Sequence, residues 1–145
     1  MLALASVVPL LPGCEGAGKA LSERENLRLL ATIPVYPHSR YFGVHTGPIY
    51  DRDTDLPEAL TPIVGYGTTV SVTVPRGTRM RDVRAFYRAA LRGWRCSTWF
   101  DTLPPPSWTA VDMSCRRGRA RFGLATENLL AARQFELSIT ARSPP

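Results

Sequence analysis

Strict alternation of apolar and hydroxyl side chains marks the most regular strand in the sequence. In residues 69–74, three valines alternate with Thr69, Ser71 and Thr73, so the valines lie on one face of a strand and the hydroxyls on the other. Residues 134–141 alternate in the same way. The two segments therefore predict strands that each have one buried face and one polar face.

Residues 79–92 have instead the spacing of an amphipathic helix. Their apolar side chains fall on one arc at about 100° per residue. Together with Trp94, which lies two residues past the range, the arc contains Met80, Val83, Phe86, Tyr87, Ala90 and Leu91. Thr78 is the expected N-cap, and Gly93 is the expected C′ residue that closes the helix. A basic stripe runs beside the apolar arc, formed by Arg81, Arg84, Arg88 and Arg92.

Three further strands are predicted at residues 95–101, 109–115 and 119–125. A proline-rich turn centred near residues 105 and 106 joins the first two, and Cys96 and Cys115 are equidistant from that centre. They should therefore face each other across a hairpin, where a disulfide would stabilise the fold by about 3 kcal/mol. The sequence Arg116-Arg-Gly118 predicts the next turn.

The segment before residue 65 is less regular. Ser22-Glu-Arg-Glu25 has the pattern of a capping box, with Ser22 as N-cap, and predicts a short helix through about Thr32 that Pro34 ends. Residues 36–45 are expected to be extended, and the acidic stretch that follows Gly47-Pro48 is expected to be an exposed loop.

These elements predict a single α+β domain over residues 36–145. One main helix would pack on an antiparallel sheet of about five strands. Residues 14–35 would form a tether with a short helix before the domain. The chain length of 145 residues leaves no room for a multidomain enzyme.

Positive charge is concentrated in the second half of the chain. Residues 14–75 carry five basic and seven acidic side chains, whereas residues 76–145 carry thirteen arginines and five acidic side chains. Arginine suits phosphate and carboxylate ligands, so we expect a surface for anionic envelope components, with the stripe formed by Arg81, Arg84, Arg88 and Arg92 as the candidate. A solvated surface that keeps the protein soluble is the alternative. Nucleic acid is not an expected partner.

The first charged side chain in the sequence is Glu15, and the apolar run before it has the length of an export signal. Leu11-Pro12-Gly13-Cys14 at its end resembles the lipobox of bacterial lipoproteins. The resemblance implies cleavage of residues 1–13, lipidation of Cys14 and an extracytoplasmic location on the bacterial cell membrane. It also leaves Cys96 and Cys115 as an even pair in an oxidising compartment. A cleaved soluble secretory protein and an ordinary N-terminal strand are the alternatives.

A second resemblance is to small bacterial lipoproteins, in the pattern Phe86-Tyr87, Leu91 and Gly93-Trp94, and it implies no activity. Residues 13–19 also satisfy the glycine and lysine spacing of a phosphate-binding loop. Position 20 is alanine, however, which provides no hydroxyl for magnesium, so nucleotide binding is not expected.

No catalytic motif or cofactor site is evident, and we expect a binding or structural module rather than an enzyme. The rival hypothesis is a small hydrolytic or metal-dependent envelope enzyme that uses the region of His38 and His45 with Asp51 or Asp53. The spacing of the two histidines is not that of a known metal motif.

Overall fold

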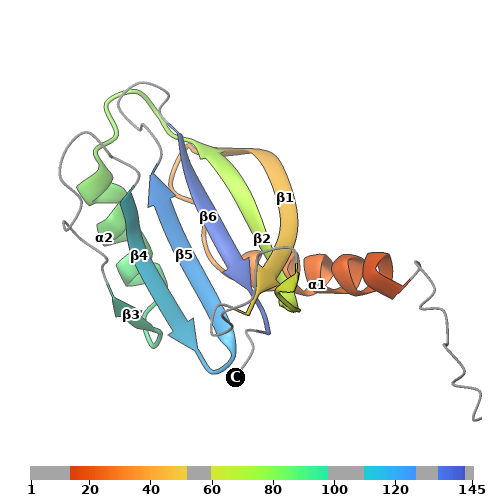
Figure 1. Cartoon of the computed structure of the whole chain (residues 1–145). Helices are drawn as coiled ribbons and strands as arrows, with labels where there is room; N and C mark the ends of the chain where they lie inside the picture. The colour runs from red at the N-terminus through yellow and green to blue at the C-terminus, as the bar shows by residue number, and fades with distance from the viewer. Residues whose placement is uncertain (1–13, 52–59, 98–109, 127–133, 143–145) are drawn as a thin grey trace, which may run out of the picture.

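Two helices pack on one face of a six-stranded antiparallel sheet (Figure 1). The computed structural model describes residues 14–51, 60–97, 110–126 and 134–142. In chain order its elements are α1 (Cys14–Leu30), β1 (Arg40–Tyr50), β2 (Ile63–Thr73), α2 (Met80–Ala90), β3 (Arg95–Ser97), β4 (Ala110–Arg117), β5 (Ala120–Thr126) and β6 (Gln134–Thr140). The strand order is β1-β2-β6-β5-β4-β3. The predicted α+β class is confirmed, with one more strand than the sequence indicated.

The core lies between α2 and the sheet. The predicted valine face is confirmed, since Val70 and Val72 in β2 are buried, as is Val74 just beyond the strand. Val83 and Tyr87 of α2 and Leu91, the residue that caps its C-terminus, are spaced four apart and are buried against the sheet. The Tyr87 ring lies 5.6 Å from the ring of Phe122 in β5 and 6.1 Å from that of Phe135 in β6. This burial raises the pKa of the Tyr87 phenol far above its ordinary value.

The N-terminus of α2 differs from the prediction. Thr78 is not the N-cap, because the first helical hydrogen bonds, from the N–H groups of Asp82 and Val83, are accepted by the carbonyl of Arg79. The N-cap residue is Arg79, which gives no side-chain cap and instead pairs with Asp82 in the first turn at 3.2 Å. At the other end Gly93 has φ +93°, as expected of the glycine that follows a helix.

The predicted N-terminus of α1 is wrong by about two turns. The helix begins at Cys14, so Ser22 lies inside it and is not an N-cap. Glu25, the other capping-box residue, bonds instead to Arg142 at the far end of the chain, at 2.9 Å. The C-terminal half of α1 packs into the domain through Asn26 and Leu30, both buried. The helix is therefore part of the fold as well as a projection from it (Figure 1).

The sixth strand is β1, at the edge of the sheet. The sequence predicted an extended segment only to residue 45, but pairing with β2 continues through Gly47 and Pro48 to Tyr50. An edge strand tolerates proline because one side of its backbone needs no partner in the sheet. The predicted acidic loop falls mostly on residues 52–59, which lie outside the described residues.

The predicted hairpin between the cysteines is confirmed in its register. Cys96 in β3 is directly opposite Cys115 in β4, and a disulfide joins them. Because β3 is an edge strand of three residues, this covalent bond ties it to the sheet. The proline-rich segment of the hairpin lies outside the described residues.

Candidate anion-binding face

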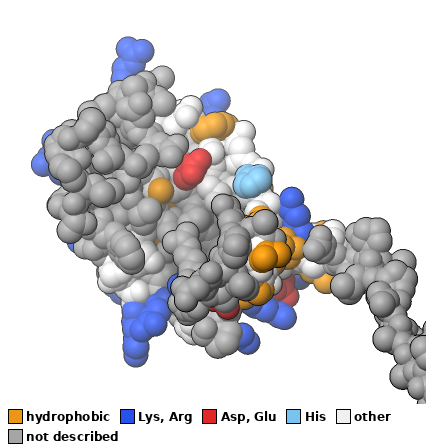
Figure 2. Space-filling model, viewed as in Figure 1, with side chains coloured by type: hydrophobic (Ala, Val, Ile, Leu, Met, Phe, Trp, Pro, Cys, Tyr) orange, Lys and Arg blue, Asp and Glu red, His pale blue; other side chains and the backbone are white. Residues whose placement is uncertain are grey.

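The side of the sheet opposite the two helices is polar, and we call it the polar face. It carries the hydroxyls of Thr69, Ser71 and Thr73, which alternate with the buried valines of β2 as the sequence predicted. The neighbouring strand β6 presents Ser138 and Glu136 on the same face. Figure 2 shows the molecule in the view of Figure 1, with basic side chains at several points around its margin.

Three arginines stand side by side on the polar face. Strand pairing sets Arg95 of β3 opposite Arg116 of β4, and Arg116 opposite Arg121 of β5. Side chains that are directly opposite in antiparallel strands have Cβ atoms about 5 Å apart, so Arg95 and Arg121 each start close to Arg116 on the same face of the sheet. We call these three residues the arginine row.

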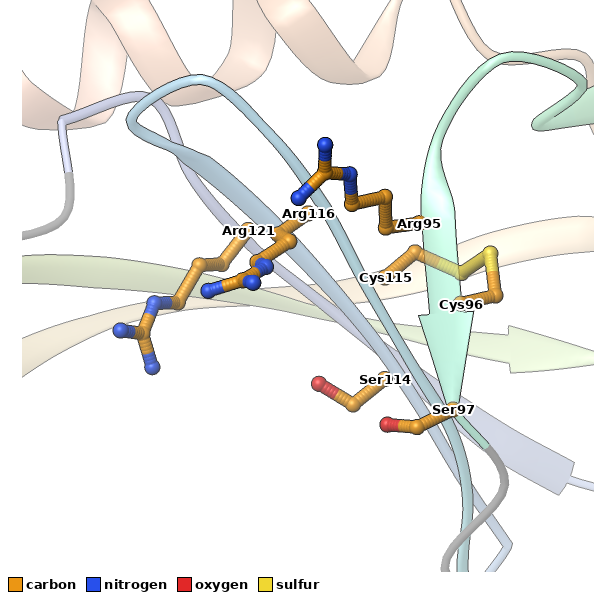
Figure 3. A pocket seen from close by; sticks show the side chains of 7 residues that line it. All are labelled: Arg95, Cys96, Ser97, Ser114, Cys115, Arg116 and Arg121. Atoms are coloured by element: carbon orange, nitrogen blue, oxygen red, sulfur yellow. A yellow bond between two sulfur atoms is a disulfide. The ribbon is translucent and has the colours of Figure 1, made fainter.

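The arginine row lines an open hollow of about 330 Å³ (Figure 3). Ser97 and Ser114 complete the polar lining of the hollow. They lie two residues from Arg95 and Arg116 along β3 and β4, on the same face of the sheet. In Figure 3 the side chains of Arg116, Arg121 and the two serines project to one side of the strands, and the disulfide lies on the other side. The hollow therefore offers guanidinium and hydroxyl donors together.

Within the described part of the chain, no carboxylate forms a salt bridge with the arginine row. The ion pairs among described residues involve other arginines, Arg79 and Arg81 with Asp82, and Arg142 with Glu25. Like charges directly opposite each other in a sheet are destabilising, and arginine keeps its charge at all ordinary pH values. An anion placed between the three guanidinium groups would remove this repulsion and accept charge-assisted hydrogen bonds.

A second line of side chains crosses the polar face beside the arginine row. The pairing sets Ser97 opposite Ser114, Ser114 opposite Gly123, and Gly123 opposite Ser138, and the line continues to Thr69 and His45 at the edge. We call it the hydroxyl row, formed by Ser97, Ser114, Ser138 and Thr69. A Cβ atom at position 123 would collide with the Ser138 hydroxyl, so glycine keeps this position free of a side chain.

The predicted arginine stripe on α2 lies apart from the arginine row, because α2 packs on the other face of the sheet. The Nε atom of Arg81 lies 3.6 Å from the Oδ1 atom of Asp82. Arg84 is half-buried, and Arg88 and Arg92 are exposed. Arg117, the neighbour of Arg116, also turns away from the polar face and stacks 4.8 Å over the ring of Trp94. The arginines of the predicted stripe and those of the arginine row therefore lie on opposite sides of the sheet.

The histidines of the rival hypothesis occupy different parts of the fold. His38 lies in the turn before β1 with φ +59°, whereas His45 lies within β1 and is exposed. Asp51 directly follows β1, and Asp53 lies outside the described residues. Among the described residues, no group of three or more histidine, cysteine or carboxylate side chains is arranged to hold a metal ion.

Of the lipobox-like sequence, residues 11–13 lie outside the described residues, and Cys14 is the first residue of α1. Gly18 and Lys19, which belong to the phosphate-loop pattern, are helical. In the described part of the chain, neither helix has the length and hydrophobicity needed to span a bilayer.

Comparison with protein families, curated proteins and solved structures finds no match.

Proposed function

We propose that the protein is a lipid-anchored, extracytoplasmic binding module whose polar face binds a phosphate-bearing component of the bacterial cell envelope. The observation that carries the proposal is the arginine row, three guanidinium groups on adjacent strands that line one hollow with two serine hydroxyls. Guanidinium groups donate paired hydrogen bonds to phosphate oxygens, and serine hydroxyls can donate to the same anion. No part of this role requires a cofactor.

The lipid-anchored location is supported by the lipobox-like sequence and by the position of Cys14. The helix that begins at Cys14 projects from the domain, and its first turns, including Leu21, are largely exposed (Figure 1). At 1.5 Å per residue, residues 14–21 would hold the domain roughly 10 Å from a lipid attached at Cys14. The Cys96–Cys115 disulfide suits the oxidising compartment that export implies.

Lipidation can be tested by growing cells that express the full chain with a fatty-acid probe. We expect the protein to take up the label and the Cys14→Ser variant to lack it, because the thiol of Cys14 is the only attachment point in the lipobox-like sequence. Cys96→Ser is the matched control and should still be labelled. Equal labelling of the Cys14→Ser variant would exclude the anchor.

Phosphate binding can be tested by calorimetric titration of the full chain with glucose 1-phosphate. Replacing Arg116 with Gln removes the central member of the arginine row and should lower the affinity at least tenfold, since a hydrogen bond to a charged group contributes about 1.5–3 kcal/mol. Affinity of the unmodified chain should also fall as salt is raised.

Arg88→Gln is the matched control for this titration. It makes the same change in net charge at an exposed position on α2, outside the arginine row, and should leave the affinity within twofold of the starting value. An equal loss in both variants would indicate attraction by net charge rather than binding at the arginine row. Unchanged affinity in Arg116→Gln would contradict the site itself.

A further inference from the structure

We infer that the ligand of the polar face is a hydroxyl-rich chain, such as an oligosaccharide, that carries a phosphate at one end. The phosphate would lie on the arginine row and the chain would run along the hydroxyl row toward β2. This inference rests on the proposed function, because it takes phosphate binding at the arginine row as given and specifies what is attached to the phosphate.

The first argument is the direction of the hydroxyl row. Neighbouring strands are about 4.8 Å apart, so Ser138 on β6 lies two strand widths from Ser114 on β4, and Thr69 on β2 lies one strand width beyond Ser138. From β5, which carries Arg121, the row continues about 10 Å to β2. A ligand the size of inorganic phosphate would reach only its beginning, whereas a chain of sugar units could use all of it.

At β5 no side chain of the strand itself stands between Ser114 and Ser138. Gly123 lies on β5 between Ser114 and Ser138, where any other residue would place a Cβ atom against the Ser138 hydroxyl. The Ser138 hydroxyl occupies the space that a side chain at position 123 would take, so a ligand that crosses β5 here meets a hydroxyl group of the hydroxyl row. Beyond it the surface hollows again, at a second open cavity of about 360 Å³ lined by Thr69, Glu136 and His45.

A further argument is the distribution of charge. The arginine row is confined to β3, β4 and β5, whereas the second cavity carries the carboxylate of Glu136, which forms no salt bridge with a described residue. Glu136 lies four residues from Thr140, the β6 partner of Arg121, a separation of about 13 Å along the strand. A chain with phosphates throughout would be repelled at Glu136, but one with a single terminal phosphate would place neutral hydroxyl groups there.

The experiment compares three ligands of equal charge and increasing length, glucose 1-phosphate, maltose 1-phosphate and maltotriose 1-phosphate, titrated into the full chain. We expect affinity to rise with each added sugar and maltotriose without phosphate to bind at least tenfold more weakly than its phosphate. Thr69→Val should lower the affinity for maltotriose 1-phosphate roughly fivefold, the effect of losing one hydrogen bond, and leave glucose 1-phosphate unchanged.

Thr73→Val is the matched control, because Thr73 lies on the same strand and the same face but outside the hydroxyl row. It should change neither affinity. If the three phosphates bind equally and Arg116→Gln still weakens all of them, the inference is wrong and the proposed function stands. If none of the three binds, both are wrong.

Discussion

Replacing Asn26 with Ala should lower the free energy of unfolding by about 3 kcal/mol, the largest loss we expect from a polar residue in this protein. Asn26 is 1% exposed and its amide connects three parts of the fold. Its Nδ2 donates to the carbonyl of Tyr66 at 3.1 Å and to the hydroxyl of Thr68 at 3.0 Å. Its Oδ1 accepts from the N–H of Ala141 at 2.6 Å. Alanine would leave the carbonyl of Tyr66 and the N–H of Ala141 without this partner, whereas the Thr68 hydroxyl would keep its hydrogen bond with Thr46. Each unpaired buried group costs about 1–3 kcal/mol.

The measurement is urea unfolding followed by circular dichroism, with Ser22→Ala as the control. Ser22 lies one turn earlier on the same face of α1, and the same kind of truncation there should change stability by less than about 0.5 kcal/mol. The control also tests where the helix begins, because replacing a serine N-cap with alanine lowers the free energy of unfolding by about 1 kcal/mol. Equal stability of the Asn26 and Ser22 variants would mean that the buried amide does not hold α1 to the sheet.

Asn26 shows why the sequence did not predict how α1 packs. Its partners are 40, 42 and 115 residues away, and nothing local marks an asparagine within a polar helix as buried. The predicted capping box at Ser22 matched the local pattern, but the helix continues to Cys14 and Glu25 pairs with Arg142 instead. The packing of α1 thus depends on long-range hydrogen bonds, which local sequence patterns do not reveal.

The β1 strand was only partly predicted for a different reason. Strand prediction relies on burial of alternate residues, but β1 lies at the edge and leaves Phe42 and Val44 more than half exposed. Gly47 and Pro48 then interrupt the pattern, although pairing continues through them. Val70 and Val72 of β2 and Val83 and Tyr87 of α2, in contrast, are buried as predicted, because α2 packs on the sheet through these side chains.

The arginine row could have been found from the sequence. The equal distances of Cys96 and Cys115 from the hairpin centre predicted their pairing, and that register already places Arg95 opposite Arg116. The two-residue turn at Gly118 then sets Arg116 opposite Arg121. The predicted strands at 95–101 and 119–125 contain Arg95 and Arg121, and the predicted turn contains Arg116, but the sequence analysis did not place the three in one row. The stripe on α2, chosen by helical spacing, identified a shared helix face and could not show that the sheet lies between it and the polar face.

Loss of the Cys96–Cys115 disulfide should lower the free energy of unfolding by about 3 kcal/mol, the value the chain-entropy model gives for a loop of this length. Cys96→Ser removes the bond at an exposed position and leaves Cys115 buried as a small apolar side chain. Urea unfolding of the oxidised chain, the chain with dithiothreitol and the Cys96→Ser variant measures the effect. The reduced chain and the Cys96→Ser variant should have the same free energy of unfolding, and dithiothreitol should not change that of Cys96→Ser. Identical unfolding of the oxidised and reduced chains would exclude a stabilising role.

The same bond should also affect the arginine row, because in the described part of the chain β3 has three residues and pairs with β4 alone. Without the covalent bond, this short edge strand is held only by a few backbone hydrogen bonds, so Arg95 should lose its fixed position beside Arg116. We therefore expect dithiothreitol to weaken glucose 1-phosphate binding by the natural chain, and to have little effect on an Arg95→Gln variant that already lacks this contact. If both proteins lose affinity equally on reduction, the disulfide acts on the whole domain and not through the position of Arg95.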